Sequence, residues 1–220
     1  MTIGILGTGM VGQTLGSALI AKGHSVILGS RSKVNEKASK WVETNGPLAR
    51  QDDFRTAAEE SEVIFLCLNG DKAIDALRLA GKASFSRKLV IDVTNPLDFS
   101  KGMPPTLIDG LANVHSLGEA IQAELPDAHV VKSLNTVTAA LMVAPQTVNG
   151  GDHHLFICGN DAASKETAKD LLAREFGWQR ANILDLGDIS AARSLEAYVT
   201  LWVRLMQSQG TPMFNIKIVR

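Results

Sequence analysis

The sequence predicts an α/β fold, a Rossmann-type, doubly wound and mostly parallel sheet with a short C-terminal helical extension. Strand-like and helix-like segments alternate to about residue 186, which favours parallel strands joined by helical crossovers. Most of the strand segments are continuous apolar runs, as expected of strands covered by helices on both faces. We therefore expect a Rossmann domain over residues 1–186 and a C-terminal helix and tail, packed on it, over residues 187–220.

The elements follow in order from apolar runs, turn residues and helical spacing. Strands are predicted at residues 2–6, 25–28, 63–68, 89–93, 130–134, 155–158 and 183–186. Helices are predicted at residues 13–22, 34–45, 72–80, 118–125, 162–176 and 189–207. In the last helix Leu195, Val199, Trp202 and Met206 recur at helical spacing, so one face should pack on the domain or on a partner. The tail over residues 210–220 is expected to be a short strand or an arm.

A glycine-rich turn joins the first strand to the first helix, and its residues are Gly7, Thr8, Gly9, Met10, Val11 and Gly12. The first glycine permits the sharp turn, the second permits close approach of a pyrophosphate, and the third permits close packing of helix and strand. The pyrophosphate would rest on free N–H groups at the helix N-terminus. This motif, in its strand–turn–helix context, predicts a dinucleotide site formed by all six residues.

The end of the second strand indicates which dinucleotide binds. An NAD site usually has Asp or Glu there, whereas this chain has Ser30, Arg31, Ser32 and Lys33. Hydroxyls and cations suit a 2′-phosphate, and the Arg31 guanidinium can bind it as a fork or stack on adenine. The alternative is that Arg31 and Lys33 are only solvated loop charges. We expect NADP(H).

Composition excludes several classes of protein. The formal net charge is −1 and no basic stripe with interleaved aromatic residues occurs, so no nucleic-acid partner is expected. The apolar runs are shorter than the ~20 residues that span a bilayer, and the chain starts directly with strand residues rather than a secretory signal. We therefore expect no membrane partner and a cytoplasmic location. Cys67 and Cys158 fall in separate strands, where a disulfide is not expected.

Ligands of open parallel sheets lie beyond the C-terminal ends of the strands. This rule adds cofactor contacts at Leu68, Asn69, Asn95, Pro96 and Asn135. The two later asparagines can hydrogen-bond ribose or carboxamide groups, and Pro96 with Leu134 can form an apolar wall for a nicotinamide ring. Asparagine at a strand end is also common as a simple turn residue.

The sequence shows no clear candidate for a catalytic acid, base or nucleophile, so we predict no catalytic residue. Lys132 lies in the fifth strand and is expected to extend to solvent. Asp92 is expected to satisfy backbone groups near the switch point of the sheet. Adjacent residues of a strand point to opposite sides, so His153 and His154 are not expected to share a metal, and no metal site is predicted.

An ordered set of motifs resembles one enzyme family across nearly the whole chain. The segments are residues 7–12, 29–31, 92–96, 130–136, 156–161 and 185–187. Together they resemble the NADP oxidoreductases that depend on coenzyme F420 (8-hydroxy-5-deazaflavin), and they are similar to the cytoplasmic oxidoreductase domain of the STEAP metalloreductases. The resemblance implies hydride transfer between NADP(H) and a deazaflavin, or a flavin such as FMN or FAD.

The resemblance also implies where the second ring lies, near Leu134, Thr136, Val137 and the last helix. Transfer between two stacked rings needs orientation more than a proton donor, which agrees with the missing acid and base. The expected partner is thus a small-molecule redox acceptor. Its identity, the hydride face, the direction of transfer and a homo-oligomeric state stay open.

Two other hypotheses for the function remain. The first is an NADPH-dependent imine or carbonyl reductase, for which Lys132 is the one candidate proton donor, but only about thirty residues follow residue 186, too few for the helical domain of such enzymes. The second is a non-catalytic NADP-binding sensor, in which the apolar face of the last helix binds a partner.

Overall fold

The computed structural model describes residues 1–111 and 113–219 and confirms the Rossmann-type α/β fold. Arg220, the last residue of the predicted C-terminal region, lies outside the described residues. The strands of the main sheet are β1 (Thr2–Leu6), β2 (Ser25–Ser30), β3 (Ala49–Asp53), β4 (Val63–Leu66), β5 (Leu89–Asp92), β8 (His129–Ser133), β9 (Leu155–Gly159) and β10 (Ile183–Asp185). A separate small hairpin pairs β6 (Leu97–Asp98) with β7 (Thr106–Leu107).

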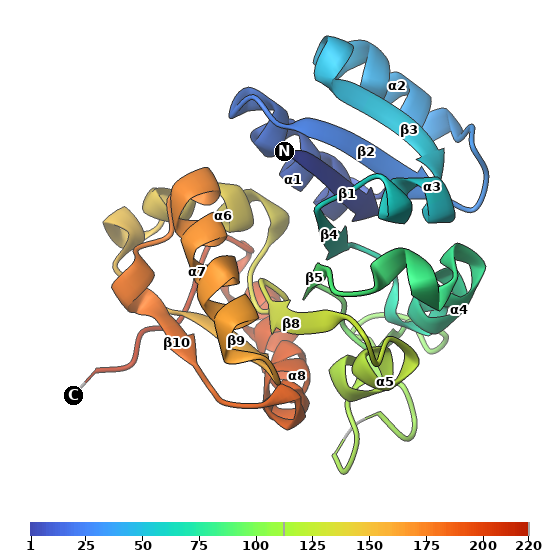
Figure 1. Ribbon diagram of the computed structural model, residues 1–220. Helices are drawn as coiled ribbons and strands as arrows, with labels where there is room; N and C mark the ends of the chain where they lie inside the picture. The colour runs from blue at the N-terminus through green and yellow to red at the C-terminus, as the bar shows by residue number, and fades with distance from the viewer. Residues whose placement is uncertain (112, 220) are drawn as a thin grey trace.

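The strand order in the main sheet is β10-β9-β8-β5-β4-β1-β2-β3 (Figure 1). β2 and β3 lie on one side of β1 while β4, β5 and β8 lie on the other, so the strand order reverses beside β1. All neighbours from β3 to β8 are parallel. An open parallel sheet binds ligands in the crevice at such a reversal, beyond the C-terminal strand ends.

The last two strands run against the rest of the sheet, because β9 is antiparallel to β8 and β10 is parallel to β9. The sheet is therefore mostly parallel, as predicted, and the exception is this edge. The connection from β8 to β9 holds a helix of only five residues, α6 (Ala139–Val143), and two short 3-10 turns. A parallel crossover usually contains a longer helix that spans the sheet, whereas this chain returns from the same edge at which β8 ends.

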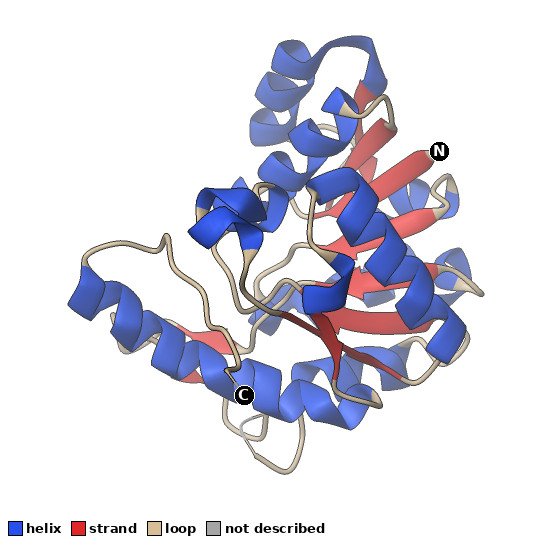
Figure 2. Ribbon diagram, turned by 90° about the vertical axis from the view of Figure 1, so that its left-hand side faces the viewer, coloured by secondary structure: helices blue, strands red, loops and turns tan. Residues whose placement is uncertain are grey.

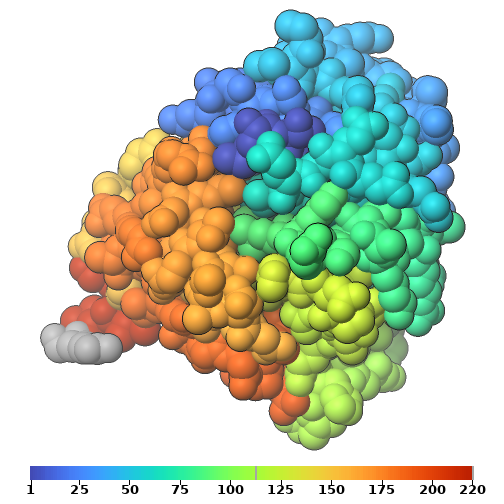
Figure 3. All heavy atoms as spheres, in the orientation of Figure 1, coloured from blue at the N-terminus to red at the C-terminus, as the bar shows by residue number. Residues whose placement is uncertain are grey.

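Helices cover both faces of the sheet, which explains the apolar strands. The remaining helices are α1 (Met10–Ala21), α2 (Glu36–Asn45), α3 (Phe54–Glu59), α4 (Gly70–Ala80), α5 (Leu117–Glu124), α7 (Ala162–Phe176) and α8 (Ala192–Gln209). One apolar cluster lies between the sheet and α1, α2, α6 and α7, and a second lies between the sheet and α3, α4, α5 and α8. In Figure 3 the same segments pack into a continuous surface, with the N-terminal strand partly covered near the top of the view.

The C-terminal helix and arm pack against the sheet domain. Leu195, Val199 and Val203 of α8 are buried, and Figure 2 shows the arm turning back from the end of this helix. Phe214 stacks on Trp202 at a centroid distance of 5.6 Å. The His154 amide donates to the carbonyl of Ile216 at 3.0 Å. Within the described part of the tail no strand forms, so it is an arm. None of the described helices is long and apolar enough to cross a membrane.

Candidate functional site

The three glycines of the turn after β1 meet different surroundings. A Cβ on Gly7, which has φ +128°, would lie 2.2 Å from the carbonyl oxygen of Cys67. A Cβ on Gly12 would lie 2.3 Å from the carbonyl oxygen of Gly7, whereas a Cβ on Gly9 would meet no protein atom within 4 Å. Gly7 and Gly12 are therefore required by the fold itself, while the space above Gly9 is open to a ligand.

The start of α1 fits an anionic group. The N-cap residue Gly9 provides no side-chain hydrogen bond, and no acidic residue lies in the first helical turn. The first N–H groups of a helix have no partner within the helix and carry the positive end of its dipole. Together with the open space at Gly9, these groups suit a pyrophosphate.

The end of β2 presents the predicted basic residues, with a feature that the sequence did not reveal. Ser30 is buried, and its hydroxyl donates to the carbonyl of Ser32 at 2.6 Å. Arg31 and Lys33 are exposed, and no described carboxylate lies within ion-pair distance of either. The unpredicted strand β3 places Asp53 opposite Ser30. The Asp53 carboxylate caps α3 by accepting from the Thr56 amide at 2.8 Å, which lowers its pKa.

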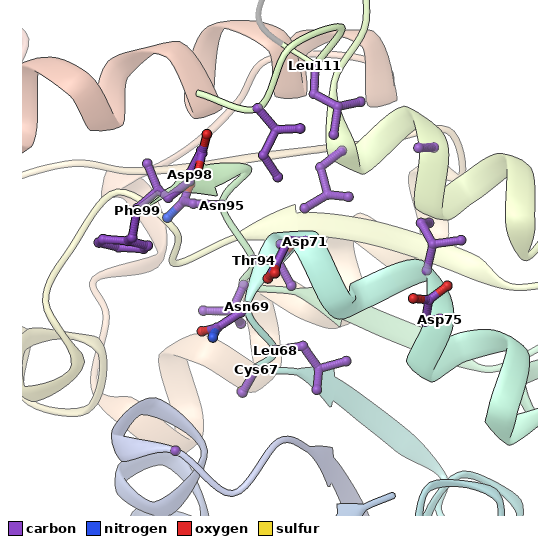
Figure 4. Close-up of a pocket in the computed structure, with 18 of the residues that line it drawn as sticks. Cys67, Leu68, Asn69, Asp71, Asp75, Thr94, Asn95, Asp98, Phe99 and Leu111 are labelled. Atoms are coloured by element: carbon purple, nitrogen blue, oxygen red, sulfur yellow. The ribbon is translucent and has the colours of Figure 1, made fainter. Parts of the chain in front are cut away.

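A cavity of about 1140 Å³ opens at the C-terminal edge of β4 and β5 (Figure 4). It extends from the start of α1 to the β6–β7 hairpin and the start of α5. Its walls are formed by Gly9, Met10, Val11, Cys67, Leu68, Asn69, Gly70, Asp71, Ile74, Asp75, Val93, Thr94, Asn95, Leu97, Asp98, Phe99, Ser100, Ile108, Asp109, Leu111, Leu117 and Ala120. The cavity therefore lies at the crevice that the strand order predicts.

The structure brings part of the predicted site together around this cavity. Gly9, Met10, Val11, Leu68, Asn69 and Asn95 line it. Gly7, Thr8 and Gly12 support the same turn, Pro96 follows Asn95, and Ser30, Arg31, Ser32 and Lys33 lie outside the cavity at the end of β2. The wall is tightly built at Gly70, where a Cβ would lie 2.2 Å from the carbonyl oxygen of Asn95.

The residues expected beside a second ring are not on the cavity wall. Leu134, Thr136 and Val137 are all buried and at most 5% exposed. Leu134 also has φ +63°, a left-handed conformation that is uncommon for a branched side chain. In the described structure these residues pack beneath the site.

Asn95 and Asn135 form a pair that links β5, β8 and α8. The Asn95 amide donates to the carbonyl of Asn135 at 2.9 Å, and the Asn135 amide donates to Asn95 Oδ1 at 2.9 Å and to the carbonyl of Leu195 at 3.2 Å. The Oδ1 atom of Asn135 is buried without a partner among the described residues. Buried acceptors are rarely left unpaired, but Asn135 does not line the cavity, so its contact with a cofactor stays a prediction.

The prediction that Lys132 extends to solvent is wrong, because its side chain is 0% exposed. Its ammonium lies 2.8 Å from Asp92 Oδ2 and 2.7 Å from Glu196 Oε1, and it donates to the carbonyl of Thr94 at 2.7 Å. Burial lowers the pKa of Lys132, but the two carboxylates outweigh burial and raise it. Burial raises the pKa of Glu196, an effect that Lys132 opposes. Lys132 does not line the cavity, so it is not placed to donate a proton there.

Sequence reasoning missed the acidic side chains of the cavity, which are Asp71, Asp75, Asp98 and Asp109. Figure 4 shows Asp71 and Asp75 on α4, and Asp98 near Asn95 and Phe99. Hydrogen bonds from Ser100 hold the pKa of Asp98 below its usual value. Among the described lining residues none is Lys, Arg or His. The rule for strand ends did not find this set, because all four aspartates lie beyond the positions that the rule selects.

Neither cysteine has the properties of a nucleophile. Both are free, and burial raises the pKa of the Cys67 thiol and raises that of Cys158 to about 12. Thiolates, not thiols, react as nucleophiles. In the described residues no group of three His, Cys, Asp or Glu side chains has the arrangement of a metal site.

Comparison with known proteins gives three findings. Residues 2–96 match the model of NADP oxidoreductases that depend on coenzyme F420. Metalloreductase STEAP3 of Rattus norvegicus is 30% identical over 212 residues, which cover 96% of this chain and 38% of that protein. Metalloreductase STEAP2 of Homo sapiens is 26% identical over 207 residues, covering 92% of this chain and 37% of that protein. The chain thus spans less than two fifths of these curated relatives.

Solved structures extend the likeness over the full length. A crystal structure of a protein from Arthrobacter sp. FB24, assigned as an F420-dependent NADP reductase, is 42% identical, covers 100% of both chains and superposes with a TM-score of 0.92. A reductive aminase from Aspergillus terreus, in complex with NADPH and ethyl levulinate, is 20% identical and has a TM-score of 0.66 over 95% of this chain and 62% of that chain. The second likeness shows a shared fold.

Proposed function

We propose that this chain, which belongs to the coenzyme F420-dependent NADP oxidoreductase family, is an NADP-dependent oxidoreductase that transfers hydride between NADP(H) and a planar redox ring, a deazaflavin or a flavin. The observation that carries the proposal is the continuity of the cavity. It runs from the open space at Gly9 to an apolar far wall. One cavity is therefore large enough to hold the reactive end of a dinucleotide beside a second ring.

The proposed cofactor position follows from the geometry of the loops. The pyrophosphate would bind the turn of residues 7–12, the 2′-phosphate would bind Ser30, Arg31, Ser32 and Lys33, and the nicotinamide would lie over residues 93–95. Leu68 and Asn69 would contact the ribose. When bound, NADPH supplies the hydride.

The far wall of the cavity suits a flat apolar acceptor. Leu97 and Phe99 come from the hairpin strand and the turn after it, Ile108 and Leu111 follow β7, and Leu117 begins α5. Phe99 is 56% exposed, so its ring is available to stack on a ligand. Aromatic and aliphatic surfaces of this kind orient planar ligands, and orientation is the main requirement for direct transfer between two rings.

Proton transfer by the protein has little support at this site. The lowered pKa of Asp98 makes its carboxyl a poorer proton donor, and Lys132 is enclosed by three acceptors. The hypothesis of an imine or carbonyl reductase thereby loses Lys132, its one candidate proton donor. Family membership also favours an enzyme over the alternative hypothesis of a non-catalytic NADP-binding sensor.

The test is oxidation of NADPH by a panel of acceptors, followed by loss of NADPH absorbance. We expect turnover with coenzyme F420, riboflavin or FMN, and faster turnover with NADPH than with NADH. A ferric chelate is included because the metalloreductases are relatives. Reduction of a cyclic imine with no turnover of any ring compound would contradict the proposal.

A further inference from the structure

A fully buried ion cluster joins β5, β8 and α8 beneath the wall of the cavity. It consists of Lys132, Asp92 and Glu196, whose side chains are each at most 1% exposed. Asp92 and Lys132 are register partners on adjacent parallel strands. The three acceptors at 2.7 to 2.8 Å, which are Asp92, Glu196 and the Thr94 carbonyl, match the three hydrogens of the ammonium.

We propose that Lys132, held by Asp92 and Glu196, is a positioning residue that fixes two walls of the nicotinamide half of the cofactor site. This inference rests on the proposed function, in which NADP(H) binds with its nicotinamide over residues 93–95. The cluster does not touch the cavity. It acts through Thr94 on one wall and through α5 on the other.

The first wall is the segment that follows β5. Lys132 binds the carbonyl of Thr94, while Asp92 Oδ1 accepts from the Thr94 amide at 2.9 Å and from its hydroxyl at 2.7 Å. Three polar groups of one residue are thereby tied to the cluster. Thr94 lines the cavity together with its neighbours Val93 and Asn95, so the cluster determines where this segment lies.

The second wall is the start of α5. Glu196 accepts from the Leu117 amide at 2.8 Å and from the Gly118 amide at 2.9 Å. This carboxylate therefore satisfies free N–H groups of the helix and interacts favourably with its dipole. α5 and α8 are also in close contact, since a Cβ on Gly118 would lie 2.8 Å from that of Ala192. Leu117 lines the cavity.

Stability alone does not account for such a cluster. The cost of removing charges from water often equals or exceeds their mutual attraction, and apolar residues of similar size can stabilise a core as well or better. Unlike apolar packing, the ion cluster fixes the positions of particular groups, because each of its hydrogen bonds ends on a defined backbone or side-chain atom. Five of these bonds, three on Thr94, one on Leu117 and one on Gly118, lead to the two walls.

The test compares binding of NADPH with binding of adenosine 2′,5′-bisphosphate, which has the 2′-phosphate end but lacks nicotinamide. Glu196→Gln keeps the shape of the side chain but turns an N–H group toward a backbone N–H of α5. We expect the dissociation constant of NADPH to rise by about tenfold, in line with one charged hydrogen bond. The constant for adenosine 2′,5′-bisphosphate should stay within about twofold. Isothermal titration calorimetry measures both.

Glu175→Gln is the matched control, because Glu175 is a buried glutamate of α7 that pairs with His24 at 3.0 Å and with Arg174. It should leave both dissociation constants unchanged. Equal weakening of both compounds by Glu196→Gln, or no weakening of either, would overturn the inference while leaving the proposed function intact. If the unmodified protein binds neither compound, the proposed function fails and this inference fails with it.

A second measurement needs no variant. Hydrogen exchange of the unmodified protein should show that NADPH slows exchange of the Thr94, Leu117 and Gly118 amides more than adenosine 2′,5′-bisphosphate does. Identical protection by the two compounds would contradict the link between the ion cluster and the nicotinamide half.

Discussion

Gly9 is the loop residue whose absent side chain leaves space for a ligand rather than for the protein. Its φ of −81° and ψ of −178° are accessible to any residue, so Gly9→Val should fold with a nearly unchanged melting temperature. The added methyl groups would occupy the place of the pyrophosphate, and we expect NADPH binding to be lost in calorimetry. Gly12→Val is the contrasting variant, because its side chain would collide with the Gly7 carbonyl and should lower the melting temperature. Normal NADPH affinity in Gly9→Val would show that the loop is only a turn.

Arg31 is the residue on which the preference for NADP(H) depends. It is exposed at the end of β2, where a guanidinium can pair with a 2′-phosphate. Arg31→Ala should weaken NADPH binding by about 1.5 to 3 kcal/mol, the range for hydrogen bonds to charged groups, and barely change NADH binding. Lys37→Ala, an exposed cation of α2, is the control. Equal affinity of the unmodified protein for NADH and NADPH would refute the assignment.

At the scale of elements, the turn that follows β6 supplies the exposed ring of the cavity. Phe99→Ala removes a stacking surface, so the KM for a flavin acceptor should rise about threefold to tenfold, given about 0.5 to 1.5 kcal/mol for an aromatic pair. NADPH affinity should not change. Met103→Ala is matched in location, since Met103 is 59% exposed between β6 and β7 but does not line the cavity. A similar KM in both variants would place the acceptor elsewhere.

The pair formed by α5 and α8 predicts a response to pH. Glu119 accepts from the Ser116 amide in the capping box of α5 and receives a forked pair of bonds from Arg193 of α8 at 2.9 and 2.5 Å. Arg193 is the largest cause of the fall of the Glu119 pKa from 4.5 to about 2. A lowered pKa stabilises the fold above the ordinary value of 4.5, and this stability is lost as pH falls from 4.5 towards 2.

Glu119→Gln should therefore lower the free energy of unfolding by about 1 kcal/mol at neutral pH, a modest value because both side chains are partly exposed. The variant should also flatten the acid limb of stability, measured by urea unfolding between neutral pH and the onset of acid unfolding. An unchanged slope in the variant would show that Glu119 does not contribute to acid sensitivity.

Elements with strong local signals were predicted well from sequence. α7 has the predicted bounds of residues 162–176, because Asp161 caps its start and Gly177 ends it with φ +82°. β3 was missed because the edge strand Ala49–Asp53 is polar and only Ala49 is buried. α3 and α6, with six and five residues, are too short to show helical periodicity.

At the scale of the molecule, the four aspartates around the cavity should select the charge of the acceptor. Like charges repel where water is partly excluded, so riboflavin should have a lower KM than FMN, which carries a phosphate. Added salt should reduce this difference by screening. Asp98→Asn should also reduce it, whereas Asp127→Asn, at an exposed position outside the cavity, should not. A lower KM for FMN would contradict this prediction.

The glycine loop and the basic end of β2 could be predicted because each is written in consecutive residues. The acidic lining and the ion cluster could not, because they join segments far apart in sequence. Lys132 and Asp92 are forty residues apart, and nothing near Lys132 in the chain identifies Glu196 as its second partner. A lysine within an apolar strand thus has the same local sequence whether it reaches solvent or a buried pair of carboxylates.

The bond from Glu196 to the start of α5 also bears on the order in which the protein is assembled. The two carboxylate bonds span 79 and 78 residues, and such distant contacts form late because a long loop must close first. On the ribosome, the glycine loop and β2 are made well before α8. We therefore expect a nascent chain to acquire its phosphate-binding end first and to complete the reactive half of its site only when α8 docks.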